Sequence, residues 1–370
     1  MTRPELPCAS TFALALALAA LVAGCAAPLP TTELPPTRVV ANAPEFPDLR
    51  DYRGVIDCRF AASGLDQVKI AELARNAQMD FIVPGDRVKP GQSDFGVGGY
   101  TSEVLFIPGG SFEAGGGEIV AVNLHAPIDP GKSASDLIGA IHEQGALAIA
   151  LGPANFRTPD DYALADAIGI YSQQQVWAEQ SPRALFLRAI FFSADRFLGA
   201  IDQRPDRNLA AYDRLAAGAR VTLLAGMGGA ENMAVMGSRV GTFEQLFLFY
   251  STHLIAAERT ADALIDAIKH GHAYVSFDLM GYVNQFAFYA QTGSAKTMMG
   301  DEVQLAPGLA LKAELPAAAD RIALVLNGSE IASATNASTL EFAPTSAGAY
   351  RIEAFRSGRP WIFSNPVYVR

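Results

Sequence analysis

The chain has 370 residues and a mass of 39.2 kDa; half of its residues are apolar and 18% are charged. This composition excludes a disordered chain and supplies enough apolar material for a sizeable core. The net charge is −10 and no run of lysine or arginine occurs, so nucleic acid is not an expected partner. Three cysteines are too few for a disulfide framework or a zinc cluster. The length predicts two domains, or one large α/β domain with an appendage.

The first segment has the features of a bacterial export signal. Residues 1–10 hold one basic residue, Arg3, and an apolar run at 11–23 follows that is too short to span a bilayer well. The run ends in Val-Ala-Gly-Cys at 22–25, which resembles the lipobox of bacterial lipoproteins. We therefore expect residues 1–24 to be a lipoprotein signal peptide. Acyl chains on Cys25 would then anchor the mature chain to a membrane.

The residues after this cysteine indicate where the protein lies. By resemblance to lipoprotein sorting in Gram-negative bacteria, an alanine after Cys25 favours the outer membrane, with the folded part facing the periplasm. Residues 25–50 carry six prolines and no apolar period, so they predict a semi-rigid tether behind the lipidated cysteine. Cys58 is then the remaining thiol of the folded part, and we expect it in the core.

Short apolar runs alternate with amphipathic stretches from Arg53 onward, a pattern typical of parallel strands joined by helices. The apolar spacing predicts helices over 65–79 and 133–144. From residue 285 the pattern changes to short alternating runs, and Asn327-Gly328 predicts a type I′ hairpin between two of them. We therefore predict a small antiparallel β-sandwich at the C-terminus, with a boundary near residues 280–288.

Several segments in this order resemble the PHP (polymerase and histidinol phosphatase) superfamily of metal-dependent phosphoesterases, particularly its CehA/McbA-like branch. They are RGVIDCRFAASG at 53–64, VLFIPGG at 104–110, LIGAIHEQGALAIALGP at 137–153 and AIKHGHAYVSF at 267–277. The resemblance implies an α/β fold, with a distorted (β/α)7 TIM-like barrel over residues 51–283 and the β-sandwich over 284–370. It also implies a site at the C-terminal ends of the strands, where two or three divalent metals activate water.

The residues at the family's ligand positions are largely different here. The first His-x-His falls on Asp57-Cys58-Arg59, and the family's Thr-Asp-His falls on Gly85-Asp86-Arg87. Ser111 stands where the family has a bridging glutamate, and Glu118 stands where it has the histidine of a Gly-His pair. The resemblance therefore implies a PHP-like pseudoenzyme that has lost its metals, and no cofactor is expected.

Arg59 and Arg87 stand at two of the family's histidine positions, next to three acids, Asp57, Asp86 and Glu118. The resemblance therefore implies that their positive charges replace the charge of the lost metals. A guanidinium can pair with a carboxylate through two parallel hydrogen bonds. Three interpretations remain open. The arginines form a self-satisfied ion-pair network, or they also hold a small anionic ligand, or the three acids hold one Mn²⁺ or Mg²⁺ in a rebuilt site.

His125 follows the strand predicted around 118–124 and is the one histidine that we consider for the site. His142 is expected to be structural, and His270 and His272 are expected to cap a helix end at Gly271. Taken together, the sequence predicts a lipid-anchored, periplasm-facing protein that lacks metal-dependent catalysis and serves as a binding or scaffolding module. An envelope protein is a further expected partner. The alternatives are a metal-dependent phosphoesterase and a structural envelope lipoprotein.

Overall fold

The computed structural model describes residues 40–96, 98–172, 203–228, 233–235, 238–240 and 242–370. The predicted signal peptide, Cys25 and most of the predicted tether lie outside these residues. Within the described part, no helix is long and apolar enough to cross a membrane. The last residues of the predicted tether form β1 (Asn42–Ala43) and the start of β2 (Phe46–Cys58), so the predicted tether contains strand residues.

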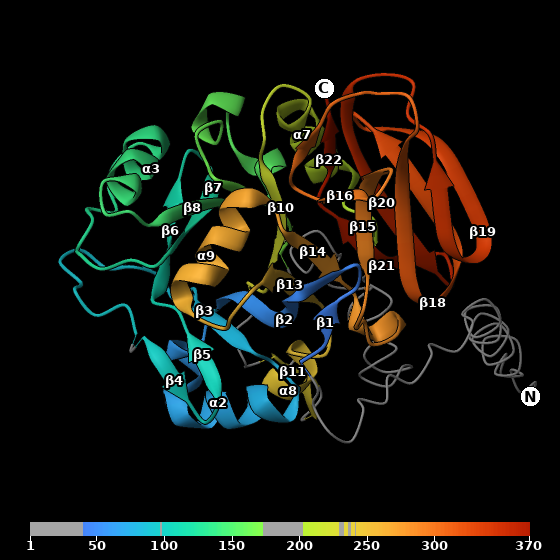
Figure 1. Ribbon diagram of the computed structural model, residues 1–370. Coiled ribbons are helices and arrows are strands. Elements are labelled where there is room, and N and C mark those ends of the chain that lie inside the picture. The colour runs from blue at the N-terminus through green and yellow to red at the C-terminus, as the bar shows by residue number, and fades with distance from the viewer. Residues whose placement is uncertain (1–39, 97, 173–202, 229–232, 236–237, 241) are drawn as a thin grey trace, which may run out of the picture.

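The first part of the chain is a mixed α/β structure, as predicted (Figure 1). Its helices are α2 (Gln67–Asn76), α3 (Ala134–His142), α7 (Asp206–Ala216), the short α8 (Phe243–Leu246) and α9 (Ala261–His270). Its further strands are β3 (Phe81–Pro84), β4 (Gly99–Thr101), β5 (Val104–Phe106), β6 (Gly109–Ala114), β7 (Gly117–Val122), β8 (Leu147–Leu151), β9 (Ala167–Ser172), β10 (Thr222–Gly226), β11 (Met233–Val235), β12 (Ser238–Val240), β13 (Ser251–Ala256) and β14 (Ala273–Ser276).

The strand pairing does not establish the predicted (β/α)7 barrel. β2–β3, β8–β9 and β9–β10 are parallel, whereas β6–β7 and β7–β8 are antiparallel. β10 pairs with β2 through the single pair Gly226↔Ile56. β6 pairs with the segment after β3 through the isolated bridge Arg87↔Ser111. The reversal arises at Gly115 and Gly116, which both adopt positive φ and form the tight turn between β6 and β7. The described strands therefore form a mixed sheet, apart from β11 and β12, which pair with each other in a separate antiparallel sheet.

Local sequence signals explain where the helices begin and end. The Asp66 side chain accepts a hydrogen bond from the Lys69 N–H at 2.8 Å and caps α2. The buried face of α2 consists of Ile70, Ala71, Leu73 and Ala74, which follow the predicted helical spacing. α9 begins after Thr260 and ends at Gly271, whose φ of 71° confirms the predicted helix end.

The C-terminal part is built from strands that are antiparallel apart from the β17–β22 pair. β18 is long: its first half pairs with β15 and β19, and its second half pairs with β19 and β20. Asn327 and Gly328 both have positive φ between β18 and β19, which confirms the predicted hairpin. The strands are β15 (Ala287–Thr292), β16 (Ala295–Met298), β17 (Glu302–Val303), β18 (Leu309–Leu326), β19 (Ser329–Phe342), β20 (Gly348–Arg356), β21 (Arg359–Ser364) and β22 (Val367–Val369).

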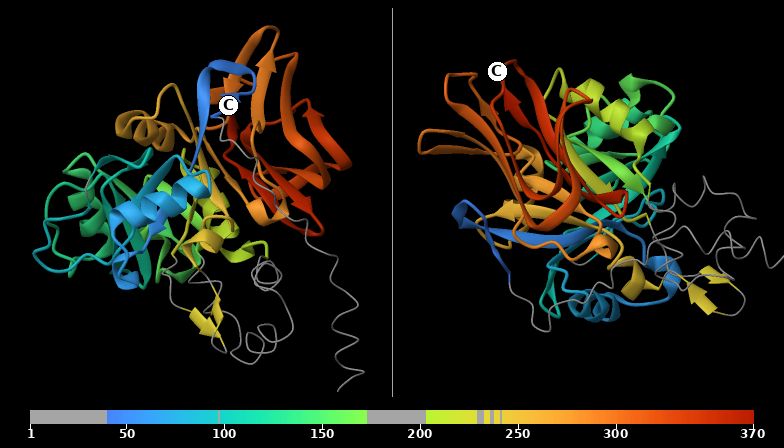
Figure 2. Two further views of the ribbon diagram at one scale, coloured as in Figure 1. Left: turned by 90° about the horizontal axis from the view of Figure 1, so that it is seen from below. Right: turned by 90° about the vertical axis from the view of Figure 1, so that its right-hand side faces the viewer.

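The two parts share one sheet. β14 pairs with β13 on one side and with β21 on the other, through pairs such as Tyr274↔Ser364. The β1–β2 hairpin also reaches the C-terminal strands, as Figure 2 shows, and Phe46 packs edge-on against Tyr289 there. Because the sheet is continuous, the domain boundary at residues 283/284 stays a prediction.

Candidate functional site

Arg59 joins two carboxylates at the C-terminal end of β2. Its Nε and Nη2 donate hydrogen bonds to Oδ1 and Oδ2 of Asp57, each at 2.9 Å. Its Nη2 also lies 2.6 Å from Oε1 of Glu118, which is the second residue of β7. Asp57 is fully buried, whereas the side chains of Arg59 and Glu118 are 14% and 13% exposed. One guanidinium therefore connects two strands that are distant in sequence.

The backbone around Asp57 has little room. Asp57 has a φ of 64°, a conformation that is uncommon for residues other than glycine. Gly85, at the end of the neighbouring β3, approaches it so closely that a Cβ there would lie 1.9 Å from Oδ1 of Asp57 and 2.5 Å from its Cα. The close approach therefore requires glycine at position 85.

Burial sets the protonation of these groups. It raises the pKa of Asp57 to about 7, although Arg59 opposes the shift through its charge and hydrogen bonds. Burial also lowers the pKa of Arg59, but the charges of Asp57 and Glu118 outweigh this and raise it overall. Burial raises the pKa of Asp86 as well, against hydrogen bonds that its carboxylate accepts from backbone N–H groups, including that of Ala61 at 3.0 Å. Arg59 is thus the fixed positive charge beside Asp57 and Asp86, two acids whose pKa values burial raises.

Arg87 and Ser111 complete the cluster from the next strand. Their backbones form a parallel bridge, in which the Ser111 N–H donates to the Asp86 carbonyl at 3.0 Å. The Arg87 guanidinium is more open than that of Arg59 and lies 3.5 Å from Glu118 and 2.6 Å from Glu113. Ser111 is fully buried, and its hydroxyl has no hydrogen-bond partner among the residues that the structure describes.

Glu113 was missed by the sequence analysis, although a signal for it exists. In a strand, residues two apart face the same side, so Ser111 on β6 predicts that Glu113 lies on that side too. The family's ligand positions do not include Glu113, which is why the comparison of motifs did not reveal it.

His125 does not join the candidate site. β7 runs antiparallel to β8, so its first residues, including Glu118, lie beside the C-terminal end of β8 and its last residues lie at the opposite end. Val122 lies four residues after Glu118 along the strand, a distance of about 13 Å, and His125 lies beyond Val122. His125 is exposed, and its backbone N–H donates to Gln144 at 3.2 Å. Our prediction assumed that the strand ran parallel to its neighbours, and the hairpin overturns it.

The residues present do not fit a divalent metal. Across the described ranges, no group of three or more histidine, cysteine, aspartate and glutamate side chains is arranged to hold a metal ion. The set of Asp57, Asp86 and Glu118 does not form the metal site of our alternative interpretation. The Arg59 guanidinium lies between Asp57 and Glu118 and pairs with the carboxylate oxygens that a metal would need. A cation at this position would have to displace Arg59.

The charge balance of the same cluster does not favour an anion either. Two guanidiniums, Arg59 and Arg87, face four carboxyl groups, those of Asp57, Asp86, Glu113 and Glu118. The carboxyl groups of this cluster therefore outnumber its guanidiniums. A self-satisfied ion-pair network describes the geometry best.

The other histidines contact acids outside this cluster. His142 Nε2 lies 2.8 Å from Oδ2 of Asp166, and His272 Nε2 lies 3.1 Å from Oδ2 of Asp301. His270 Nδ1 lies 2.9 Å from the Asp266 carbonyl in the last turn of α9. These contacts fit the structural roles that we predicted for the three residues.

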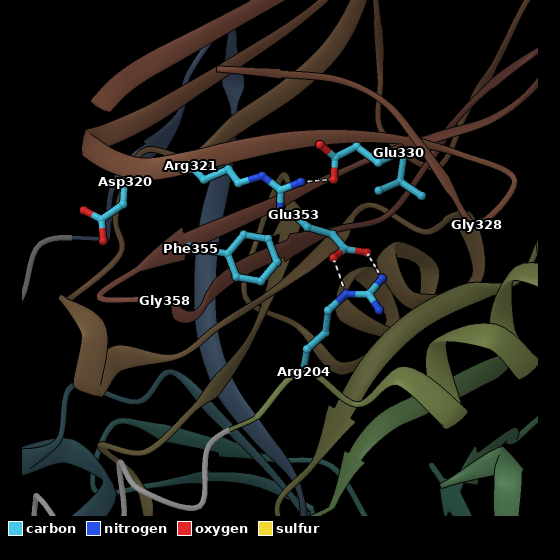
Figure 3. A pocket seen from close by; sticks show the side chains of 9 residues that line it. Arg204, Asp320, Arg321, Gly328, Glu330, Glu353, Phe355 and Gly358 are labelled. Atoms are coloured by element: carbon cyan, nitrogen blue, oxygen red, sulfur yellow. Dashed lines mark hydrogen bonds and ion pairs between the residues drawn. The ribbon is translucent and has the colours of Figure 1, made fainter. Parts of the chain in front are cut away.

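A separate cavity of about 550 Å³ opens between the C-terminal strands and the segment before α7 (Figure 3). The Phe355 ring is one of its walls and lies between Arg321 and Arg204 in this view. Arg204 approaches from the α/β part and donates to both oxygens of Glu353, at 2.7 and 2.8 Å, while Arg321 pairs with Glu330 on the other side. The lining residues are Arg204, Asp320, Arg321, Val325, Gly328, Glu330, Glu353, Phe355 and Gly358.

Comparison with known proteins finds similarity among solved structures. No family model matches the chain, and no curated protein matches it. Among solved structures, the chain is similar to a two-domain protein from Bacteroides vulgatus that contains a predicted PHP-like metal-dependent phosphoesterase. The two chains share 12% identity with a TM-score of 0.42, over 90% of this chain and 100% of that chain. A likeness at this level assigns no activity.

Proposed function

We propose that this protein is a lipid-anchored, periplasm-facing member of the PHP-like group whose site works without metal, and that it serves as a binding or scaffolding module. The observation that carries the proposal is the position of Arg59 between Asp57 and Glu118. In a metal-dependent site, clustered carboxylates face a cation that compensates their charge. Here a side chain of the protein itself supplies that charge.

The chemistry of arginine supports this interpretation. A guanidinium remains charged under all ordinary conditions, so it stabilises neighbouring acids permanently but cannot lower the pKa of a bound water as a divalent metal does. The neighbouring Ser111 is buried, and within the described part of the chain no base lies at hydrogen-bonding distance to activate its hydroxyl. The cluster therefore stabilises the fold, and the binding role belongs to another surface.

The cavity around Phe355 is the candidate for that role. Its volume lies in the range that holds a small molecule, and it combines an aromatic ring with guanidinium and carboxylate groups that can orient a polar ligand. Both parts of the chain contribute to it, so a ligand bound there would also stabilise their arrangement.

Metal analysis tests the absence of a metal site. The purified protein is measured by elemental mass spectrometry, and its thermal unfolding is followed with added Mn²⁺, with a chelator, and with neither. We expect less than a tenth of an equivalent of metal and the same melting temperature in all three samples. A stoichiometric metal, a shift of several degrees with Mn²⁺, or hydrolysis of p-nitrophenyl phosphate would establish the phosphoesterase alternative instead.

Lipid attachment is tested separately in a Gram-negative host. Cells expressing the full chain are labelled with radioactive palmitate, and the membranes are then separated by density. We expect label on the wild type and on Cys58→Ser, none on Cys25→Ser, and wild-type protein in the outer-membrane fraction. Label on Cys25→Ser, or unlabelled wild type, would contradict the anchor without affecting the metal result.

A further inference from the structure

The cavity around Phe355 is built mainly by the C-terminal strands. Among the residues that the structure describes, Arg204 is the one lining residue that comes from the α/β part. The other lining residues lie on β18, β19 and β20 or in the hairpins at the ends of these strands. Gly358, in one of these hairpins, is exposed and has open space around its Cα, so the cavity is accessible at that end.

Arg204 ends on a buried carboxylate in the wall of this cavity (Figure 3). Its Nε and Nη2 donate to Oε2 and Oε1 of Glu353, at 2.7 and 2.8 Å. This two-pronged contact is the geometry by which a carboxylate recognises a guanidinium. The Glu353 side chain is 2% exposed, whereas that of Arg204 is 33% exposed. The contact therefore resembles a ligand group bound to a site on the C-terminal strands.

The C-terminal strands hold Glu353 in place without Arg204. Arg351, two residues earlier on β20, is buried and donates from Nη2 to Oε1 of Glu353 at 2.6 Å. Its Nη1 lies 2.9 Å from Asp213 on α7. If Arg204 leaves, Glu353 thus keeps a positive partner and its position, and the Arg351–Asp213 pair still joins the two parts of the chain.

Arg204 also has a second partner, which lies away from the cavity wall. Its Nη1 pairs with Asp206, the first residue of α7, whose side chain is 74% exposed. Arg204 can therefore turn away from Glu353 into solvent and keep a carboxylate partner. The contact with Glu353 is replaceable for this reason.

The remaining walls of the cavity also suit a guanidinium. The Phe355 ring already has the guanidinium of Arg321 over it, at 5.8 Å from the ring centroid. A planar guanidinium can stack on an aromatic ring and bind a carboxylate through two hydrogen bonds, which an ammonium cannot do. An anionic ligand would instead face the carboxylates of Glu353, Glu330 and Asp320.

We propose that the cavity around Phe355 is a binding site for a guanidinium-bearing ligand, and that Arg204 is a built-in plug that occupies this site in the free protein. The assignment rests on the binding role that we proposed for the cavity. The ligand replaces Arg204 on Glu353 by exchange of hydrogen bonds, and Arg204 turns to Asp206. Because a tethered group competes at a high effective concentration, the plug weakens binding of the ligand.

Isothermal titration calorimetry on the purified full chain tests the plug. The probes are agmatine, a free small molecule, and acetyl-Gly-Arg-Gly-amide, which represents an arginine side chain of another protein. We expect one-to-one binding, at least tenfold tighter to Arg204→Ala than to the wild type. Arg214→Ala is the matched control, because Arg214 is an exposed arginine of α7 outside the cavity, and it should bind like the wild type. The probe that binds more tightly identifies the source of the guanidinium.

Matched peptides test the chemistry without a further variant. A citrulline peptide keeps the shape and loses the charge, and a lysine peptide keeps the charge and loses the two-pronged geometry. We expect both to bind Arg204→Ala at least tenfold more weakly than the arginine peptide. Equal binding of the citrulline peptide, or no binding of either guanidinium probe, would overturn the proposal. Binding to Arg204→Ala with none to the wild type in the millimolar range would also overturn it, because Arg204 is then a fixed structural contact.

Two further variants separate the possible failures. Arg204→Lys keeps a charge beside Glu353 and loses the two-pronged contact, so it tests the same expectation of tighter binding if Arg204→Ala does not fold. A ligand without a guanidinium that binds the wild type and is lost in Phe355→Ala would support the binding module and overturn the guanidinium assignment. The metal and lipid measurements are independent of both results.

Discussion

The guanidinium of Arg59 contacts both carboxylate oxygens of Asp57 at 2.9 Å, and its Nη2 lies 2.6 Å from Glu118. The two acids come from β2 and β7, which do not pair with each other. A single side chain therefore provides a link between two strands and the charge that keeps two buried carboxylates compatible with the fold.

The first prediction concerns the loss of this charge. Arg59→Ala leaves Asp57 and Glu118 without their common partner, and removal of one partner from a buried pair costs about 3 kcal/mol or more. We expect the free energy of unfolding in urea to fall by that amount. Arg59→Lys keeps a charge but loses the two-pronged geometry, so we expect a smaller loss.

Lys69→Ala is the matched control, because Lys69 forms an ion pair with Glu72 in which both side chains are about half exposed. Such pairs contribute less than about 1 kcal/mol. If Arg59→Ala and Lys69→Ala cost the same, the Arg59 network does not stabilise the fold.

The second prediction is a pH dependence. The pKa of Asp57 is about 7 in the folded protein and 3.8 in the ordinary reference state, so the folded protein binds more protons than the unfolded chain between these values. The free energy of unfolding must therefore decrease as the pH rises from about 4 to about 7. One such group contributes a slope of no more than about 1.4 kcal/mol per pH unit.

Asp57→Asn isolates this contribution, because the amide does not titrate. Asp86 and Asp213 also have pKa values raised by burial, so the variant should retain some slope. We expect urea unfolding at several pH values to show a flatter profile for Asp57→Asn than for the wild type. Parallel profiles would mean that Asp57 is ionised throughout this range.

The third prediction concerns Gly85. Alanine at this position would place its Cβ 1.9 Å from Oδ1 of Asp57, and the nearby backbone prevents a simple shift. We expect Gly85→Ala to lower the free energy of unfolding by about 2 kcal/mol or more. Gly139→Ala is the control: Gly139 lies within α3 with open space around its Cα, so alanine should stabilise the protein by up to about 1 kcal/mol. The free energy of unfolding of both variants is measured by chemical denaturation. A Gly85→Ala variant as stable as the wild type would show that Asp57 has room to move.

The sequence predicted the part of the ion-pair cluster that depends on strand order. Asp57 and Arg59 lie at the end of β2, Asp86 and Arg87 follow β3, and the ends of parallel neighbouring strands lie together. The direction of β7 could not be predicted from its apolar pattern. Because β6 and β7 form an antiparallel hairpin, Glu113 and Glu118 lie at the cluster and His125 lies at the opposite end of the strand. The contact of His253 Nδ1 with Asp51 at 2.8 Å left no local signal, because the two residues are 202 residues apart and meet through the β2–β13 pairing.

The last prediction tests how the α/β part is held to the C-terminal strands. Arg351 on β20 is 1% exposed; its Nη1 lies 2.9 Å from Asp213 on α7, and its Nη2 lies 2.6 Å from Glu353. In Arg351→Ala, Glu353 keeps Arg204, but Asp213 loses the partner that offsets its burial. We expect a loss of about 3 kcal/mol in the free energy of unfolding.

Arg321→Ala provides the comparison on the neighbouring strand, because Arg321 pairs with Glu330 at a site where both side chains are more than a third exposed. We expect it to cost less than about 1 kcal/mol. The double variant Arg351→Ala with Asp213→Asn should recover part of the loss, since the amide removes the uncompensated charge. Without such recovery, the effect of Arg351→Ala comes from lost packing, and the ion pair between α7 and β20 does not hold the two parts together.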